Sequence, residues 1–463
     1  MEAVFVVVGG GIAGVSCAET LAFLQQEKSI ILLSESSLIK TVTNLHAITK
    51  TLMGFDVKEA PSSTLQAKFQ NITVVNGTLA EIQHKNSCII TQSGIIIKYQ
   101  YLCLCIGAQP KLIPQSAEYP EHIVGIRDTD SVELFLETLE KCKKLVVVGN
   151  GGIASELVFK IKNTEIHWVV KDNHISATFV DPGAAEFFQT ALLKRPATQE
   201  TVTKRMRYQE DKLHKSGAAL GPDWYQNLLI SGANSPGLHK QVSIHYQNEI
   251  SSVSALEGSE HQLEVGLTNG EKISCDLIIS ATGVSPRKNF KIDVQLELAD
   301  EGIKVDQYMK TNLENIYAAG DICSADWPIA KHWIQMKLWT QARQMGCYAA
   351  KCMSGHLNKE EILQDFCFEI FTHSTKLFGY KVILLGLFNG QKLDKKYEIL
   401  LRTTKDLEYI KLILENHRLQ GAVLIGDTDL EEMCENLILN QIDLEPYGDD
   451  ILNPDIDIED YFD

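Results

Sequence analysis

The chain has 463 residues, 44% hydrophobic and 22% charged, which is ordinary for a globular protein and excludes a disordered or fibrous one. Because a single core rarely grows past about 250 to 300 residues, we expect two or three domains. The formal net charge is −17, but fourteen acidic residues and no Lys, Arg or His follow Arg418, so the acidity belongs to the C-terminal end.

Neither a membrane span nor a metal site is expected. The longest apolar stretches, such as Val4 to Val8, are far shorter than the roughly 20 residues that cross a bilayer. Glu2 stands where a leader sequence has basic residues, so we expect no targeting signal and a place in the cytosol or nucleus. The eleven cysteines include no CxxC pair and no zinc-type spacing, so most should be small apolar core residues.

The N-terminal segment has the pattern of a βαβ unit that binds a dinucleotide. Two apolar runs, residues 4–8 and 30–34, predict buried parallel strands on either side of a helix that ends near Leu24. The turn between the first strand and the helix is G-x-G-x-x-G, and Glu35 ends the second strand, where a carboxylate accepts hydrogen bonds from ribose hydroxyls. The turn residues predicted to bind the dinucleotide are Gly9, Gly11, Ile12, Ala13 and Gly14.

The same pattern recurs about 140 residues later, which predicts a second dinucleotide site. Strands are expected over Lys144 to Gly149 and Ile166 to Val170, with a helix between them. At the end of the second strand Lys171 replaces the acid of the first unit. It is suited to the 2′-phosphate of NADPH, but an exposed lysine at a strand end is equally expected, so NADH and NADPH both stay open. The turn residues expected to bind the nucleotide are Gly149, Gly151, Ile153 and Ala154.

The middle and end of the chain suggest an insertion, a return to the first unit and a further domain. Residues 185–240 are rich in Lys and Arg, and are either a solvated excursion or a partner-binding surface. A strand at Cys275 to Ser280 and a helix from Trp333 to Cys352 follow. The C-terminal part is expected to contain strands at Tyr380–Leu387, Tyr397–Arg402, Tyr409–Glu415 and Gly421–Ile425, and a helix at Leu430–Asn440. The acidic segment from Glu445 onward is expected to be a flexible tail.

Both glycine motifs, Ser280-Ala281-Thr282-Gly283 and Thr311 to Asp321 follow one another in an order that resembles the pyridine nucleotide-disulphide oxidoreductase superfamily. The resemblance covers about 350 residues. It implies an α/β protein with two nested Rossmann-like domains and a small α+β C-terminal domain, with FAD and either NADH or NADPH as cofactors. The implied domains are FAD-binding over 1–115 and 275–352, NAD(P)H-binding over 116–274, C-terminal over 353–444, and an acidic tail over 445–463.

The resemblance also implies roles for individual residues. Asp321 would bond to the ribityl and pyrophosphate part of FAD, and a strand from Tyr101 to Gly107 would close the FAD site, which brings Cys105 and Gly107 to the cofactor. Gly283 would lie near the nicotinamide nucleotide. Lys50 lies close to where relatives place a lysine at the flavin, and Glu156 lies where they place its carboxylate partner. The two are our candidate catalytic residues, with an ordinary surface lysine as the alternative for Lys50. Lys40 is a weaker candidate for the FAD phosphate or ribose.

The chain departs from the superfamily pattern at its reactive centre. Residues 36 to 60 contain no cysteine, although disulphide reductases have a CxxxxC pair there. Cys347 and Cys352 have that spacing, but on a helix their sulfurs diverge, and Cys103 and Cys105 on one strand do not form an unstrained disulphide. His373 stands alone and is expected to be a packed or surface residue. Electrons should therefore leave to oxygen, a quinone-like molecule or another protein.

The C-terminal domain is similar to that of nitrite reductase-type flavoproteins, and nearly the whole chain resembles one branch of the superfamily that lacks the disulphide. That likeness implies a protein of nucleus and cytosol that protects the metal-dependent tRNA ligase complex from oxidation. The acidic tail, with Tyr447, Tyr461 and Phe462, suits docking on a basic surface, although a merely solubilising tail is equally expected. Direct nucleic-acid or membrane binding is not expected.

Overall fold

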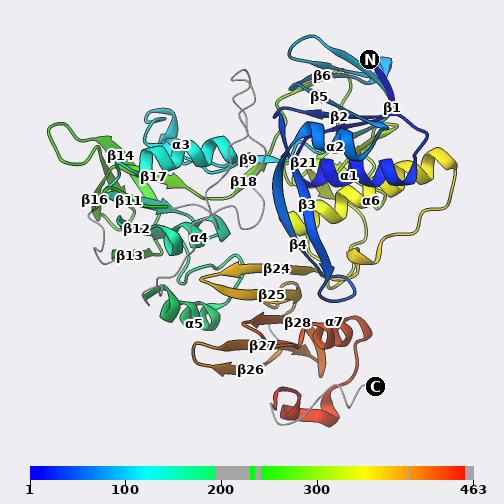
Figure 1. Ribbon diagram of the computed structural model, residues 1–463. Helices are drawn as coiled ribbons and strands as arrows, with labels where there is room; N and C mark the ends of the chain where they lie inside the picture. Colours follow the sequence, from blue (N-terminus) through cyan, green and yellow to red (C-terminus); the bar gives the residue numbers. More distant parts are fainter. Residues whose placement is uncertain (194–229, 235–240, 395–396, 454–463) are drawn as a thin grey trace.

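A computed structural model describes residues 1–193, 230–234, 241–394 and 397–453. It has two Rossmann-like units side by side with a third, antiparallel unit beneath them (Figure 1). Most of the basic segment, including Lys194 and Arg195, lies outside the described residues. No helix in the described part of the chain is both long enough and apolar enough to cross a membrane.

The first unit is built on a mainly parallel sheet in the order β19-β6-β7-β8-β1-β2-β5, with β22 paired to β8. Residues 5–8 of the first strand are buried on both faces of this sheet. The early elements are β1 (Glu2–Val8), α1 (Ile12–Leu24), β2 (Ile30–Ser34), β3 (Leu38–Ala47), β4 (Met53–Pro61), α2 (Ser62–Lys68), β5 (Ile72–Asn76), β6 (Leu79–Gln83), β7 (Cys88–Thr91) and β8 (Ile96–Leu104).

The chain returns to this unit after leaving it for some 180 residues. The returning elements are β19 (Lys291–Ile292), β20 (Leu298–Ala299), β21 (Gly302–Val305), β22 (Ile316–Ala318), β23 (Cys323–Ala325) and α6 (Trp339–Asn358). α6 packs closely on α1, since a Cβ at Gly346 would stand 2.2 Å from the carbonyl oxygen of Ala13. This helix begins six residues after the expected Trp333, because residues 333–338 form an irregular segment before it.

The second unit has the parallel sheet β10-β17-β11-β12-β13 and a three-stranded antiparallel sheet, β14-β15-β16. Because β17 pairs with β11, the return to the first unit comes later than the expected boundary at 275, after β9 and β18 have joined the units. The elements are β9 (Ala108–Pro110), β10 (Ile123–Val124), α3 (Thr129–Leu139), β11 (Lys144–Val148), α4 (Gly152–Lys160), β12 (Glu165–Val170), α5 (Pro182–Leu193), β13 (Gln241–Tyr246), β14 (Ile250–Ala255), β15 (Leu263–Leu267), β16 (Lys272–Cys275), β17 (Leu277–Ser280) and β18 (Val284–Pro286).

The C-terminal unit is one antiparallel sheet, β24-β25-β28-β27-β26, with α7 packed against it. The four expected strands and the helix are confirmed, and β24 is an additional edge strand. The elements are β24 (Thr372–Leu377), β25 (Tyr380–Gly386), β26 (Glu398–Thr404), β27 (Glu408–Glu415), β28 (Arg418–Ile425), α7 (Glu431–Asn440) and the 3-10 helix η4 (Glu445–Leu452). The expectation of a flexible tail from Glu445 was wrong for residues 445–452, since Ile451 and Leu452 are buried in the core of this unit.

Polar and apolar contacts attach the C-terminal unit to both Rossmann-like units. The β3–β4 hairpin extends from the first unit to α7 (Figure 1), where Leu52 enters the core of the C-terminal unit. The buried carboxylate of Glu435 accepts hydrogen bonds from the hydroxyls of Thr49 and Thr51. On the other side, the buried Lys411 forms an ion pair with Asp181 at the start of α5. The three units therefore form one packed structure.

Candidate functional site

A cavity of about 920 Å³ opens at the carboxyl ends of the central strands of both Rossmann-like sheets. Parallel α/β sheets bind ligands at this edge, where strands end and helices begin. Both glycine turns contribute to its wall, and so do the segment before α6 and β24 of the C-terminal unit. The expected residues that line it are Gly9, Gly11, Ile12, Ala13, Glu35, Cys105, Gly107, Gly149, Gly151, Ile153, Glu156, Lys171, Gly283 and Asp321.

The first glycine turn leaves no room for side chains on its inner side. A Cβ at Gly14 would stand 1.9 Å from the carbonyl oxygen of Gly9, and one at Gly9 would stand 2.2 Å from that of Cys105. Gly9 also has φ +125°, which glycine adopts without strain. At Gly11 a Cβ would meet nothing within 4 Å, so the backbone there faces the open cavity. The turn and the N-terminus of α1 fit a pyrophosphate, as the pattern predicts.

Glu35 lies at the end of β2 between two arginines that the sequence reasoning did not single out. Its carboxylate accepts a hydrogen bond from Arg287 at 2.7 Å and lies 3.8 Å from the guanidinium of Arg127. Burial alone would raise the pKa of this carboxyl, but the hydrogen bond from Arg287 and the charges of both arginines lower it below its usual value. Glu35 is therefore ionised and able to accept ribose hydroxyls.

Lys40 does not line the cavity, so the expected contact with FAD phosphate or ribose is not supported. It is the register partner of Glu59 across the β3–β4 hairpin, and its Nζ lies 2.9 Å from the Glu59 carboxylate. The side chain is 6% exposed, and strand alternation directs it toward that carboxylate. Only its backbone touches the site, since its N–H donates to the carbonyl oxygen of Gly10 at 3.0 Å.

The second glycine turn has the geometry of the first, except that its third position holds Ala154 instead of a glycine. Gly149 has φ +126°, and a Cβ there would stand 2.1 Å from the carbonyl oxygen of Ala281. Gly151 is open to the cavity, whereas Ala154 is fully buried and accommodates its methyl group. The indole N–H of Trp168 donates to the carbonyl oxygen of Gly149 at 2.7 Å and holds the turn against β12. This geometry fits a second pyrophosphate.

The ribose end of the second unit contains an acid that the sequence reasoning overlooked. Lys171 is exposed and lines the cavity, and so does Asp172, one residue further along. The Asp172 carboxylate accepts a hydrogen bond from Asn150 Nδ2 at 2.8 Å, which ties it to the glycine turn. The signal was its place two residues after β12, one residue further along than the place of Glu35 after β2.

The expected pair of Lys50 and Glu156 is not formed. Lys50 lies at the tip of the β3–β4 hairpin, where its Nζ donates to Asn436 Oδ1 of α7 at 3.0 Å, and it does not line the cavity. The tip is held on the C-terminal unit because the hydroxyls of Thr49 and Thr51 donate to the carboxylate of Glu435. Glu156 does line the cavity, on the second turn of α4, so only the carboxylate of the expected pair belongs to the site.

The segment before α6 and the C-terminal unit complete the wall. Met336, Lys337, Leu338 and Trp339 line the cavity, and burial raises the pKa of the neighbouring Asp321 to about 6. His373 is a packed residue behind this wall. Its Nδ1 lies 3.1 Å from Thr340 Oγ1, its ring lies against that of Trp339, and burial lowers its pKa to about 3, so it is neutral.

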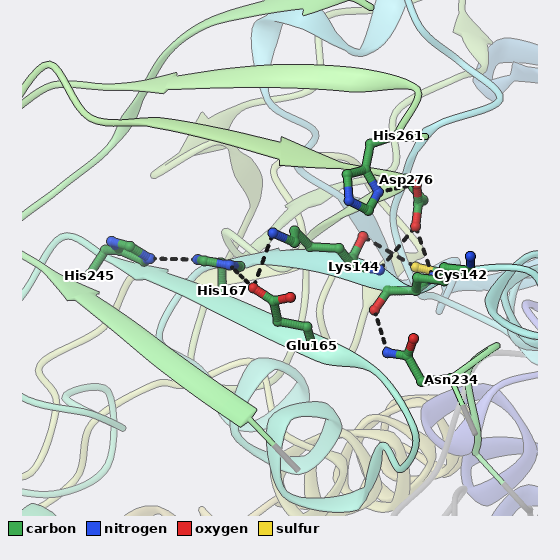
Figure 2. Close-up of polar contacts among 9 residues, drawn as sticks. Cys142, Lys144, Glu165, His167, Asn234, His245, His261 and Asp276 are labelled. Carbon is green, nitrogen blue, oxygen red and sulfur yellow. Dashed lines mark hydrogen bonds and ion pairs between the residues drawn. The ribbon is translucent and has the colours of Figure 1, made fainter. Parts of the chain in front are cut away.

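Another polar cluster lies outside this cavity, at the start of β11 and β12 (Figure 2). The ring of His167 lies between His245 and Glu165. Its Nδ1 is 2.9 Å from Nε2 of His245, and its Nε2 is 2.9 Å from Oε1 of Glu165. Lys144 approaches Glu165 at 3.1 Å, and Asp276 accepts the backbone N–H of Lys144 at 2.9 Å. These contacts join neighbouring strands across the sheet, which explains the cluster as a structural one.

Comparisons with known proteins agree with the two-turn geometry. A family model described as pyridine nucleotide-disulphide oxidoreductase matches residues 4–217 and 238–346, and one for the rubredoxin NAD⁺ reductase C-terminal domain matches 373–442. The chain is 52% identical to pyridine nucleotide-disulfide oxidoreductase domain-containing protein 1 of Drosophila melanogaster, over 99% of both chains. It is 45% identical to the protein of that name from Homo sapiens, over 99% of this chain and 98% of the relative.

Among solved structures, the fold is similar to a covalent putidaredoxin reductase–putidaredoxin complex, with a TM-score of 0.69, 16% identity, and coverage of 99% of this chain and 97% of that one. It is also similar to an NAD-dependent persulfide reductase from A. fulgidus, with a TM-score of 0.68, 16% identity, and coverage of 96% and 78%. The family match and the two turns together identify FAD and NAD(H) as the cofactors. The chain belongs to the pyridine nucleotide-disulphide oxidoreductase family.

Proposed function

We propose that the chain is an FAD-dependent NAD(P)H oxidoreductase that works without an active-site disulphide. The observation that carries this proposal is one cavity lined by both dinucleotide turns. FAD bound there would supply the redox chemistry, acceptance of a hydride from the nicotinamide and release of the electrons to an acceptor. The glycine turns would hold the two pyrophosphates through backbone N–H groups, and Glu35 would accept the hydroxyls of the FAD ribose.

The remaining polar groups of the wall orient the two cofactors. Asp321 would hold the ribityl and pyrophosphate part of FAD. Gly283 has φ +105°, and a Cβ there would meet nothing within 4 Å, so a nucleotide can approach its backbone. Glu156 supplies a carboxylate to the same wall from α4. Since Lys50 is bound elsewhere, a positive charge near the flavin would have to come from another cation of the wall, and Lys337, whose charge acts on Asp321, is our candidate.

Electrons do not leave through a dithiol in the segment after Glu35, where disulphide reductases have their cysteine pair. The hairpin β3–β4 occupies residues 38–61 and contains no cysteine, and among the residues that the structure describes Cys105 is the one cysteine that lines the cavity. All eleven cysteines are free thiols. Oxygen, a small quinone-like acceptor or a protein partner must therefore receive the electrons.

We further propose that the partner is the tRNA ligase complex and that the two meet in the cytoplasm and the nucleus. The flavoprotein would protect the complex from oxidation while its flavin is reduced and a nucleotide is bound. This rests on the resemblance over nearly the full length of the chain. It is supported by the hairpin without cysteines and by the acidic C-terminal end, which suits a basic docking surface. The alternative is a turnover NAD(P)H oxidase or reductase with a small acceptor.

The first test is to mix the flavin-loaded protein with NADH, and separately with NADPH, without oxygen, and to record the visible spectrum before and after air is admitted. Bleaching followed by slow reoxidation, with a persistent long-wavelength band, supports the protective role. Rapid reoxidation over many turnovers supports the oxidase. No bleaching with either nucleotide contradicts hydride transfer itself.

The partner is tested by removing residues 454–463, a truncation that leaves the buried Ile451 and Leu452 in place. Flavin reduction should stay unchanged, and capture of the purified ligase complex should weaken. The matched control replaces the same number of exposed acidic residues on the second unit with amides. Equal capture by the truncated chain and the control contradicts the role of the tail.

A further inference from the structure

Three buried thiols meet beneath the FAD half of the cavity. Cys103 and Cys105 lie on or directly after β8, with 3.6 Å between their sulfurs, and Cys17 of α1 is buried beside them and affects the pKa of both. We call Cys17, Cys103 and Cys105 the thiol cluster. Cys17 and Cys103 are 0% exposed, whereas Cys105 is 4% exposed and lines the cavity. Only Cys105 can thus be reached from the cavity.

The surroundings of Cys105 favour its thiolate. Its sulfur lies 3.6 Å from that of Cys103, and hydrogen bonding with the thiols of Cys103 and Cys17 holds the pKa of Cys105 below that of an ordinary cysteine against the effect of burial. The pKa values of Cys103 and Cys17 are raised, so these two stay protonated donors. A thiolate is the form of cysteine that reacts with peroxides.

The same residue supports the glycine turn that receives the FAD pyrophosphate. Its carbonyl oxygen would lie 2.2 Å from a Cβ on Gly9, and its own Cβ would lie 3.3 Å from one on Gly14. The turn therefore packs directly on the backbone and Cβ of Cys105, and a disulphide that shifts this residue must shift the turn with it.

We propose that the thiol cluster is an oxidation site that controls FAD loading: in the chain without FAD, peroxide oxidises Cys105, a disulphide to Cys17 follows, and the glycine turn can no longer receive the cofactor. Bound FAD fills the cavity and protects the site. The proposal concerns the chain before the flavin is bound and so goes beyond the proposed function.

The chemistry balances with a peroxide as the oxidant. The Cys105 thiolate attacks hydrogen peroxide, the O–O bond breaks, and a sulfenic acid and hydroxide form. The Cys17 sulfur then attacks the sulfenic sulfur, an S–S bond forms, and the hydroxyl group leaves as water with the proton from Cys17. Each sulfur is oxidised by one electron, and the peroxide is reduced by two.

Cys17 is the expected partner because of strand geometry. Cys103 and Cys105 are two positions apart on extended chain, which places their Cα atoms about 6.6 Å apart, near the upper limit for a disulphide. Cys17 lies on α1, one turn after Gly14, which packs against Cys105, and it is not held to that spacing. Reduction of the disulphide by a small dithiol should restore the original turn.

The experiment compares the full-length flavin-loaded protein with the same protein after FAD has been removed. Both are treated with hydrogen peroxide, and intact mass, peptide mapping and FAD rebinding by flavin fluorescence are measured. We expect a loss of two hydrogen atoms, a Cys17–Cys105 peptide link and at least about tenfold weaker FAD binding, only in the flavin-free protein. Dithiothreitol should reverse all three changes.

The variants separate the proposal from general oxidation damage. Cys17→Ala should form no disulphide and should retain a Cys105 that is trapped by a sulfenic-acid reagent. Cys434→Ala, which removes another buried free thiol in the C-terminal unit, should behave like the wild type. If Cys17→Ala does not fold, protection of the wild type by FAD and its rescue by dithiothreitol still decide the matter. Equal oxidation with and without FAD, a link from Cys105 to a sulfur other than Cys17, or unchanged FAD binding after the disulphide forms would each overturn the proposal.

Discussion

The two dinucleotide-binding units differ at the third turn position and at the ribose end. In the first unit a Cβ at Gly14 would lie 1.9 Å from a carbonyl oxygen, whereas in the second Ala154 is packed without strain. The first unit ends β2 with Glu35 between two arginines, and the second ends β12 with an exposed lysine followed by an acid. The first turn is thus the more closely packed of the two, and the two ribose ends differ in charge.

The largest effect on cofactor content is expected from a methyl group added on the inner side of the first turn. Gly14→Ala should lose most of its bound FAD, because the methyl group overlaps the Gly9 carbonyl and the turn must open, a change of about 1 to 3 kcal/mol or more. The flavin-to-protein absorbance ratio after gel filtration measures the loss. Wild-type flavin content in this variant would show that α1 shifts freely.

Removal of the ribose acid should have the next largest effect. Glu35→Gln loses a charged hydrogen-bond acceptor beside Arg287 and should weaken FAD binding by about 10- to 100-fold. Its KM for NADH should stay near the wild-type value, because the second ribose end is formed by other residues. Titration of flavin-free protein with FAD gives the affinity, and an unchanged value would mean that Arg127 or Arg287 binds the ribose instead.

Exchange of charge at the end of the second unit should change nucleotide preference. Lys171→Glu copies the acid of the first unit, so the ratio of kcat/KM for NADPH to that for NADH should fall by about tenfold or more. Steady-state rates with a dye acceptor measure both values. Asp172→Asn is the matched control at the adjacent position. A constant ratio in both variants would show that Lys171 does not contact the ribose end of the nucleotide.

Acid should affect the first unit through Glu35. A carboxyl whose pKa is lowered in the folded state stabilises the fold above its ordinary value of 4.5, and this stabilisation is lost as the pH falls through the lower folded value. Because Glu35 is partly exposed, the effect should stay below about 1 kcal/mol. The difference in unfolding free energy between wild type and Glu35→Gln should shrink as the pH falls from about 6 to about 3.5; a constant difference is the contrary result.

The smallest effect is expected at Ala154, the third position of the second turn, where a methyl group is already accommodated. Ala154→Gly removes a buried methyl group and adds helical glycine, so it should cost about 1 kcal/mol of stability and leave FAD content unchanged. Thermal unfolding and flavin content measure the two. If this variant lost FAD as Gly14→Ala is expected to do, the contrast between the two turns would not hold.

Local patterns predicted the cavity well because its parts are local. Each turn lies between its own strand and helix, so Gly9 to Gly14 and Gly149 to Ala154 were recognisable within a few residues. Glu35 was equally local, whereas Asp172 was missed because it stands one residue further beyond its strand than Glu35 does. Arg287 was missed because it reaches Glu35 across 252 residues.

The wrong expectations depended on distant contacts. Lys50 was placed by counting from Glu35, but the position of its hairpin is decided by Glu435, which lies 384 residues from Thr51. The tail was expected to begin at Glu445 because acidic residues dominate there, yet Ile451 and Leu452 are buried in the core of the C-terminal unit. Short-range composition does not contain this information, since the partner surfaces form only after the domains pack.

The split of the first unit around the second affects the order in which the protein is made. β8 has emerged from the ribosome long before its neighbour β22, and α1 long before α6, since more than 200 residues separate them. At roughly 5 to 20 residues per second, this interval lasts about 10 to 40 seconds. The nucleotide-binding unit has that time to fold, while half of the flavin-binding unit waits with an open strand edge. A nascent chain at this stage is the form most in need of a chaperone.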